Sequence, residues 1–194
     1  IAVFQPAGVV RLENARVCAE DNAPMALRIL TFNVHESYIQ LLAKTGHNFD
    51  VVEKEKAGIY GWIRAIRPVP ENLSLVTEAE ARAGLDAGRY DRIIAHNLGD
   101  LLSVREAETP KVLVFHNKLS TEIALSKDPV DKSEYLERVS RLFGETRNLD
   151  LVFISRAKME DWGFHGSIIL PGIDADDYGA YSGEVERVLR VGNG

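Results

Sequence analysis

The feature that most constrains the fold is a regular alternation of short apolar runs with longer amphipathic stretches. From Met25 onward, each apolar run is followed by a polar turn and then by a stretch with helical spacing of its apolar side chains. The runs lie at 27–32, 48–52, 91–95, 111–115, 149–154 and 167–170. Strands that are apolar throughout and separated by helices are typical of parallel sheets covered on both faces. The sequence therefore predicts an α/β protein with a doubly wound parallel sheet, a Rossmann-like three-layer sandwich.

Capping residues and glycines mark where the predicted helices begin and end. The expected capping boxes are Ser37 with Gln40 and Thr77 with Glu80, and Asp131 and Glu134 are expected to open a longer helix. Two further helices are expected to begin at the caps Asn97 and Ser155, and glycines are expected to end helices near Gly46, Gly88 and Gly163.

Composition excludes some classes of function. The net charge of -6 argues against nucleic-acid binding by the chain as a whole, because phosphate contacts need a basic surface. Cys18 is the single cysteine, so no internal disulfide is possible. No apolar run approaches the ~20 residues that span a bilayer, and the first residues lack the basic region of a signal peptide. A soluble, cytoplasmic protein is expected.

Three segments are predicted along the chain. Residues 1–24 form a leader, either an extension ahead of the fold or a segment with one extra strand at 8–12. Residues 25–175 form the Rossmann-like domain. Residues 176–194 are a linker and the truncated start of a second domain, because 187–194 has the pattern of a new strand followed by a glycine turn.

Polar residues gather where the predicted strands end. Ligands of open parallel sheets bind outside the carboxyl ends of the strands, so these residues are candidates for a binding site. They are Asn33, His35, Glu36, His96, Asn97, His116, Asn117, Ser155, Arg156, Pro171, Gly172 and Asp174. With the free N–H groups of helix N-termini, they would suit a hydroxyl-rich or anionic ligand.

Some of these candidates also have a purely structural interpretation. Asn97 and Ser155 are good helix caps, and Asp174 is a common turn residue. His35 could bond a loop carbonyl. His116 directly follows an apolar strand and has no competing local role, so it is the leading candidate.

The sequence lacks the standard phosphate-binding and nucleophile motifs. It contains no G-x-G-x-x-G after the first strand, no G-x-x-x-x-G-K-[ST] and no G-x-S-x-G, so no cofactor is predicted. His35, His96 and His116 follow different strands, and three such ligands can make an open zinc site. Neither H-E-x-x-H nor C-x-x-C accompanies them, so no metal is predicted and a metal-assisted hydrolase remains a rival interpretation.

Several segments, in this order, resemble the N-terminal domain of glycosyltransferase family 4, which has the GT-B fold. They are the first strand with its polar turn, Phe115-His116-Asn117-Lys118-Leu119-Ser120, the strand at 149–154 with Ser155 and Arg156, and Leu170-Pro171-Gly172-Ile173-Asp174. The resemblance covers about Ala26 to the C-terminus, where 188–192 is similar to the first strand of the family's second domain.

The resemblance implies a retaining transferase that uses a nucleotide-sugar donor and needs no metal. His116 matches the family's histidine near the donor sugar, and Asn33 to Ser37 match a polar loop beside the acceptor and phosphates. Relatives often have a Gly-Gly turn in that loop, whereas this chain has Asn-Val-His-Glu. The family's donor-binding E-x7-E segment lies in a second domain. This chain is therefore expected to be inactive without its C-terminal donor domain, since one wall cannot hold donor and acceptor together.

The basic, aromatic stretch at 54–68 has two interpretations. It mixes Lys54, Arg64 and Arg67 with Trp62 and neighbouring apolar residues, a pattern compatible with peripheral contact with an anionic membrane. The favoured interpretation is an ordinary crossover packed on the sheet with its arginine stems outward. For the whole chain, the alternatives to a transferase are a noncatalytic α/β module that binds a ligand or partner, and another GT-B enzyme such as a sugar-nucleotide epimerase.

Overall fold

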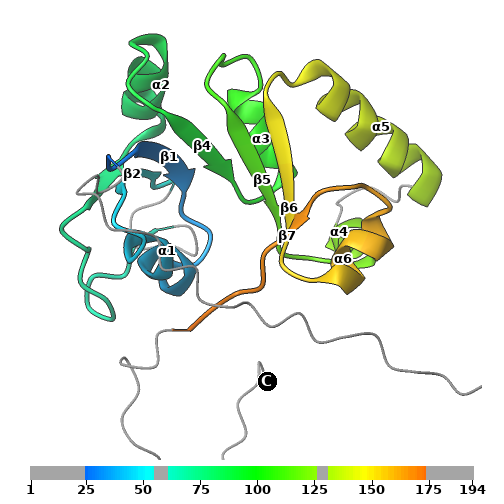
Figure 1. Cartoon of the computed structure of the whole chain (residues 1–194), viewed down its shortest axis with the longest axis horizontal. Coiled ribbons are helices and arrows are strands. Elements are labelled where there is room, and N and C mark those ends of the chain that lie inside the picture. Colours follow the sequence, from blue (N-terminus) through cyan, green and yellow to red (C-terminus); the bar gives the residue numbers. More distant parts are fainter. Residues whose placement is uncertain (1–24, 55–60, 126–130, 174–194) are drawn as a thin grey trace, which may run out of the picture.

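The computed structural model describes residues 25–54, 61–125 and 131–173, and within them it contains one all-parallel sheet (Figure 1). Its strands are β1 (Arg28–Phe32), β2 (Asn48–Val52), β3 (Leu73–Val76), β4 (Arg92–Ala95), β5 (Lys111–Phe115), β6 (Leu149–Phe153) and β7 (Ser167–Ile168). They are ordered β3-β2-β1-β4-β5-β6-β7, so the strand order reverses between β1 and β4. This is the predicted Rossmann-like, doubly wound α/β fold.

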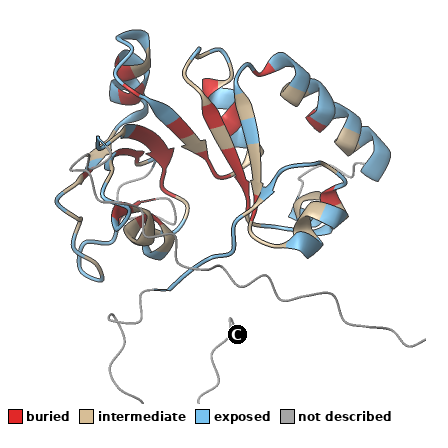
Figure 2. Ribbon diagram, viewed as in Figure 1, coloured by how far each residue is buried: buried red, intermediate tan, exposed pale blue. Residues whose placement is uncertain are grey.

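Helices cover both faces of the sheet. They are α1 (Glu36–Ala43), α2 (Glu78–Asp86), α3 (Leu98–Val104), α4 (Leu119–Leu125), α5 (Lys132–Glu145) and α6 (Arg156–Trp162). α1 packs with the loop around Trp62 on one face, whereas the buried residues of α2 to α6 join the core clusters of the other face. Burial is concentrated on the strands and on the inner faces of these helices (Figure 2).

Most of the predicted helix boundaries are confirmed. Thr77 and Glu80 form the full capping box of α2, and Asn97, Asp131 and Ser155 each cap a helix through the side chain. Gly88 and Gly163 follow α2 and α6 with φ of 62° and 71°, a left-handed conformation that glycine adopts without a Cβ clash.

The prediction that Ser37 caps the first helix is wrong. His35 occupies the N-cap position without a side-chain cap, and its carbonyl accepts hydrogen bonds from Tyr38 and Ile39. The chain therefore enters α1 two residues earlier than the Ser37–Gln40 spacing indicated. Asp131 does cap α5, but it accepts from the N–H of Ser133.

Two elements were not predicted. β3 is a four-residue strand inside the segment taken as a long crossover, and α4 is a short helix directly after the His116 turn. The last strand is shorter than predicted and covers only Ser167–Ile168. The leader 1–24, Asp174 and the segment 176–194 lie outside the described residues.

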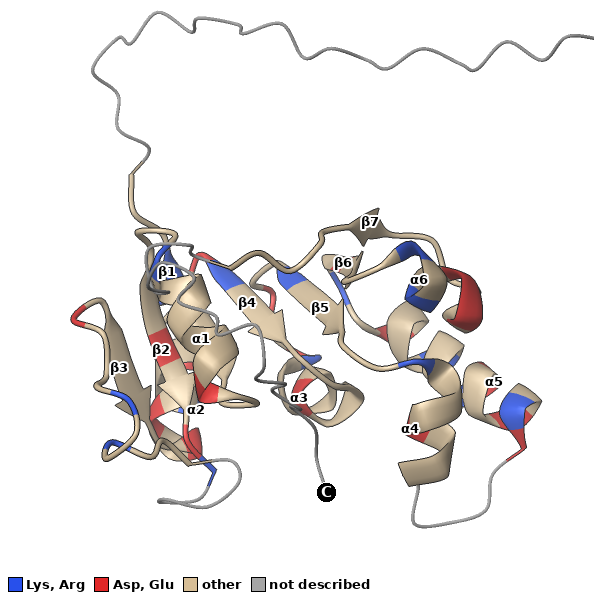
Figure 3. Ribbon diagram, turned by 90° about the horizontal axis from the view of Figure 1, so that it is seen from below, with Lys and Arg blue, Asp and Glu red and all other residues tan. Residues whose placement is uncertain are grey.

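Basic residues stand at the amino ends of β1, β4 and β5 (Figure 3). Lys111, the first residue of β5, is fully buried there. Its ammonium donates to the carbonyls of Ala107, Thr109 and Arg147, with distances of 3.0 Å and 3.2 Å to the last two. This cation therefore joins the loop before β5 to the loop before β6, at the end of the sheet opposite the predicted site.

The α1 face of the sheet is open over β4 to β6. A cavity of about 750 Å³ lies there, lined almost wholly by apolar side chains, among them Ile94, Val112, Val114 and Val152. The chain after β7 borders the same cavity with Leu170, which is 71% exposed.

Candidate functional site

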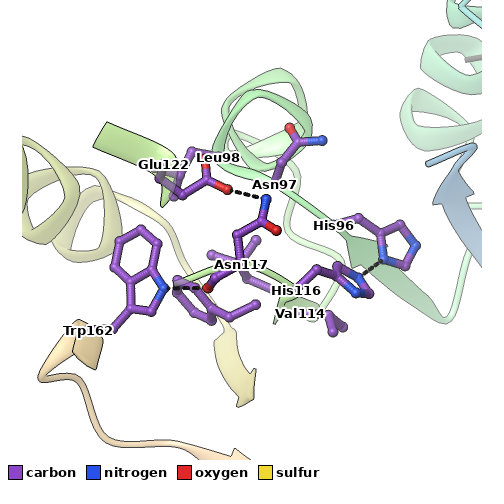
Figure 4. Close-up of a pocket in the computed structure, with 10 residues that line it drawn as sticks. His96, Asn97, Leu98, Val114, His116, Asn117, Glu122 and Trp162 are labelled. Atoms are coloured by element: carbon purple, nitrogen blue, oxygen red, sulfur yellow. Dashed lines mark hydrogen bonds between the residues drawn. The ribbon is translucent and has the colours of Figure 1, made fainter. Parts of the chain in front are cut away.

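Two histidines meet at the carboxyl ends of β4 and β5, next to the point where the strand order reverses. His96 follows β4 and His116 follows β5, and these strands are paired in register. Nδ1 of His96 lies 3.1 Å from Nε2 of His116, and Nε2 of His96 lies 2.9 Å from Oγ1 of Thr31 on β1 (Figure 4 shows the histidine pair). The side chains from β1, β4 and β5 thus form one hydrogen-bonded row across the carboxyl ends of the strands, where open α/β sheets bind their ligands. We call Thr31, His96 and His116 the histidine row.

Tyr38 of α1 packs against both imidazoles. Its ring meets His96 edge-on at a centroid distance of 5.4 Å and His116 at 4.9 Å. Edge-to-face contacts of this kind are favourable, and here they restrict how far either imidazole can turn. Burial raises the pKa of the Tyr38 phenol, so its hydroxyl stays protonated at neutral pH.

Both imidazoles are neutral at pH 7. His96 is only 4% exposed, and burial with the neighbouring His116 lowers its pKa to about 3. Burial, followed by the positive fields of His35 and Lys158, lowers the pKa of His116 to about 4. Each ring therefore carries a single proton, which makes each ring one donor and one acceptor.

Asp100 of α3 fixes the turn between His96 and the helix. This carboxylate is 1% exposed and accepts hydrogen bonds from the backbone of His96, from Nδ2 of Asn97 and from Nζ of Lys54 at 2.8 Å. Burial raises the pKa of Asp100 against the opposing effect of Lys54. Lys54 also lies over the ring of Phe32, with its ammonium 5.6 Å from the ring centre.

Asn97 and Asn117 stand beside the histidine row with structural partners of their own. Oδ1 of Asn97 caps α3 by accepting from the N–H of Asp100 at 2.8 Å. Nδ2 of Asn117 donates to Glu122, and the carbonyl of Asn117 accepts from the indole of Trp162 at 3.0 Å (Figure 4). The cavity that His96, Asn97, His116 and Asn117 line is about 20 Å³, the space of one water molecule.

The turn after β1 presents one unsatisfied group. Asn33 is buried, and among the described residues its Oδ1 is the buried side-chain oxygen or nitrogen that lacks a hydrogen-bond partner. Such an atom is uncommon in folded proteins, so Asn33 is a candidate for contact with a bound molecule. His35 next to it is exposed, and the carboxylate of Glu36 accepts from the backbone N–H of Ile63, so Glu36 ties α1 to the 61–69 loop.

The candidates at the far strands are not brought into the histidine row. Ser155 caps α6 by accepting from the N–H of Lys158, and Arg156 is exposed on the first turn of α6. Gly172 borders the apolar cavity of the open sheet face. Asp174 lies outside the described residues.

Sequence reasoning missed three members of the site. Thr31 was taken as part of an apolar strand, Tyr38 as part of an amphipathic helix, and Asp100 was not considered. One signal was available for each: a hydroxyl inside the run Ile29-Leu30-Thr31-Phe32, an aromatic residue in the first turn of α1, and an acid three residues after the Asn97 cap.

No group of three His, Cys, Asp or Glu side chains within residues 25–54, 61–125 and 131–173 lies close enough to hold a metal ion. None of the helices in this part of the chain is long and apolar enough to cross a membrane. In the stretch at 54–68, Trp62 is buried in the core and its indole donates to the carbonyl of Arg67, as expected for a crossover packed on the sheet, whereas Ile66 is exposed. Residues 55–60 of this stretch lie outside the described residues.

Comparison of the chain with protein-family models, with curated proteins and with solved structures found no match in any of the three.

Proposed function

We propose that this chain is the acceptor-side, N-terminal domain of a retaining glycosyltransferase that uses a nucleotide-sugar donor. One observation carries the proposal: the histidine row lies across the strand-order reversal, at the edge of the sheet where ligands of this fold class bind. Neutral imidazoles, amides and hydroxyls of this kind both donate and accept hydrogen bonds, which suits sugar hydroxyls. The resemblance to glycosyltransferase family 4 supports the same activity.

His116 is the proposed contact to the reacting sugar. It is partly exposed, whereas His96 behind it is buried, so His116 is the member of the pair that a ligand can reach. Asn33 at the end of β1 is a proposed water-mediated contact, because its Oδ1 lacks a partner and is buried out of a ligand's direct reach. Proposed supporting contacts are His35, Glu36, Asn97, Asn117, Ser155, Arg156, Gly172 and Asp174.

The proposal includes a second domain that completes the binding site. The cavity beside the histidine pair holds about one water, which is far below the volume of a nucleotide sugar. The donor would be held by a C-terminal, Rossmann-like domain facing this edge, and transfer requires both walls to bring donor and acceptor into reacting distance.

The test is transfer from a panel of nucleotide sugars. The 194-residue chain alone is expected to show no turnover. The chain extended by coding sequence downstream of Gly194 is expected to transfer, and His116→Ala should lower its kcat by about 100-fold. His165→Ala, at an exposed histidine away from the pair, is the matched control and should leave kcat unchanged. Turnover by the 194-residue chain would contradict the need for a second domain. An extended protein that neither binds nor turns over any of these donors would contradict the proposed glycosyltransferase activity.

The alternative is a noncatalytic α/β module that binds a ligand or partner protein. It is favoured by the apolar cavity on the open face of the sheet, which belongs to no part of the histidine row. Leu170→Ser and His116→Ala distinguish the two functions. The binding module predicts that binding of its ligand or partner protein is lost in Leu170→Ser, whereas the transferase predicts that binding of the nucleotide sugar is lost in His116→Ala.

The proposed location is the cytoplasm, with peripheral membrane contact through 54–68. Arg64 and Ile66 on the outside of this stretch are the residues such a contact would use. Co-sedimentation with anionic liposomes should fall on Arg64→Glu, and binding that is unchanged by this substitution would remove the membrane contact from the proposal.

A further inference from the structure

The hydroxyl of Thr31 has one proton and two neighbours within hydrogen-bond distance, the carbonyl of Ile94 and Nε2 of His96. Oγ1 of Thr31 donates that proton to the carbonyl of Ile94, at 3.1 Å. The same oxygen lies 2.9 Å from Nε2 of His96. Because the carbonyl of Ile94 can only accept, Thr31 makes both hydrogen bonds at once only by accepting from His96. Nε2 of His96 therefore carries the ring proton.

The next step follows from the charge of His96. Because this buried ring is neutral, with a pKa of about 3, its single proton is on Nε2 and its Nδ1 has a lone pair. The neighbour of that lone pair is Nε2 of His116, at 3.1 Å. A hydrogen bond forms across this distance only if His116 donates, so Nε2 of His116 also carries a proton.

His116 then has its lone pair on Nδ1. This ring too is neutral at pH 7. No described residue forms a hydrogen bond with Nδ1 of His116, and His116 is partly exposed. Tyr38 packs edge-on against both rings and keeps them in this arrangement.

We propose that Thr31 and His96 are positioning residues that hold His116 as its Nε2–H tautomer, so that Nδ1 accepts a hydrogen bond from a hydroxyl of the ligand. This deepens the proposed function and rests on it for the identity of the ligand. A lone pair faces the ligand, so the partner must be a donor such as a sugar hydroxyl, and a phosphate oxygen is a poor partner. Phosphate groups of a donor would therefore be bound elsewhere.

The tautomers are measured directly by long-range ¹H–¹⁵N correlation spectra of the ¹⁵N-labelled 194-residue chain at pH 7, without ligand. Both His96 and His116 should show a protonated Nε2 and an unprotonated Nδ1. Thr31→Val removes the acceptor while keeping the shape, and it should shift the His96 tautomer ratio roughly fivefold, the bias expected from one hydrogen bond. Thr31→Ser keeps the hydroxyl and should retain the native tautomers. A protonated Nδ1 on His116 in the native chain would overturn the proposal, as would a Thr31→Val spectrum identical to the native one.

The ligand class is tested by titration with methyl α-glucoside and, separately, with inorganic phosphate. The glucoside should move the Nδ1 resonance of His116 and phosphate should not; a response to phosphate alone, or none to the glucoside, would overturn the assignment of a hydroxyl partner. The tautomer spectra need no ligand and no transfer activity, so a failed transferase proposal and a failed tautomer proposal are told apart.

Discussion

Asp100 is the residue on which the geometry of the β4–α3 turn depends. Replacing it by Asn removes the charge that faces Lys54 and puts an N–H₂ group where the native oxygen accepts from the backbone of His96 or from Asn97. Because the site is buried, Asp100→Asn should lower the free energy of unfolding by about 1–3 kcal/mol, measured by urea denaturation. Glu134→Gln, which removes an exposed ion pair with Arg138, is the control and should cost at most about 0.5 kcal/mol. Equal effects of the two substitutions would contradict the buried role of Asp100.

Stability should depend on pH through the histidine pair. The folded-state pKa values of about 3 for His96 and 4 for His116 lie below the value of about 6.5 in the unfolded chain. The unfolded state therefore binds more protons than the folded state between these pH values. The free energy of unfolding should be highest above about pH 6.5 and should fall as the pH drops towards about 4. The slope due to His96 alone reaches at most about 1.4 kcal/mol per pH unit.

His96→Gln should remove about half of the slope that the two histidines give together, because His116 titrates over the same window, measured by urea denaturation from about pH 4.5 to about pH 7. His165→Gln, at an exposed histidine outside the pair, is the control and should keep the slope. Asp100 contributes with the opposite sign, because burial raises its pKa and the folded state then binds more protons. A native slope that His96→Gln leaves intact would assign the pH dependence to other groups.

Residues of the site could be predicted where their position in the sequence was enough to place them, and not where their role depends on contacts made only in the folded structure. His96 and His116 were found because a polar residue after an apolar strand of a parallel sheet must lie at the carboxyl edge. Their hydrogen bond was not predictable, because it requires β4 and β5 to be neighbours in register and both rings to turn towards each other. Thr31 was missed because its neighbours on the strand are apolar and only the folded structure brings Ile94 and His96 to its hydroxyl.

Helix α2 approaches Tyr90, which lies just before β4, through a glycine. A Cβ on Gly84 would meet the hydroxyl of Tyr90 at 2.6 Å and its ring at 2.8 Å. Tyr90 has no room to yield, because it is buried and its hydroxyl donates to Asp50 at 3.0 Å, a contact that together with burial raises its pKa to about 12. The close approach of this helix therefore depends on the missing side chain.

Gly84→Ala should lower the free energy of unfolding by about 1–3 kcal/mol, because overpacking outweighs the helix preference of alanine. Gly144→Ala in α5 is the matched control: no atom lies within 4 Å of its Cβ, so it should be neutral or stabilising by up to about 1 kcal/mol. Both are measured as shifts of the urea midpoint. A stabilising Gly84→Ala would show that α2 is not packed as closely as described.

The elements themselves were largely predictable, and the errors have local causes. β1, β2, β4, β5 and β6 stood out as apolar runs, whereas β3 has only four residues, includes an exposed serine and lies in a long connection. α4 directly follows the turn at His116 and has one buried residue, Leu119, which is too little for a helical pattern to be recognised.

The two tryptophans report on opposite faces of one sheet. Trp62 belongs to the core cluster under α1, and Trp162 to the cluster under α5 and α6. Because the sheet is shared, the molecule should unfold as one cooperative unit. In Trp62→Phe and in Trp162→Phe, the fluorescence of the remaining tryptophan and the far-UV circular dichroism should give the same urea midpoint. Each variant should be destabilised by about 1 kcal/mol through its lost indole hydrogen bond. Midpoints that differ between the probes would show that the two faces unfold separately.

The overall architecture followed from the sequence because the alternation of strand and helix leaves few topologies. The open α1 face over β4 to β6 did not, because Ile94, Val112 and Val152 have the same apolar character as residues that are fully covered elsewhere. The sequence shows which side chains are apolar, but the path of the backbone decides which of these side chains are buried.

The buried lysine at the start of β5 bears on how the sequence of this protein could evolve. Lys111 holds two loops together with an internal cation at the end of the sheet remote from the histidine row. Lys111 therefore stabilises the amino end of the sheet, and the proposed ligand site lies at the carboxyl end. Substitutions in the turns after β4 and β5 would then change which ligand is preferred without disturbing the hydrogen bonds of Lys111. New specificities could arise in this way on an unchanged scaffold.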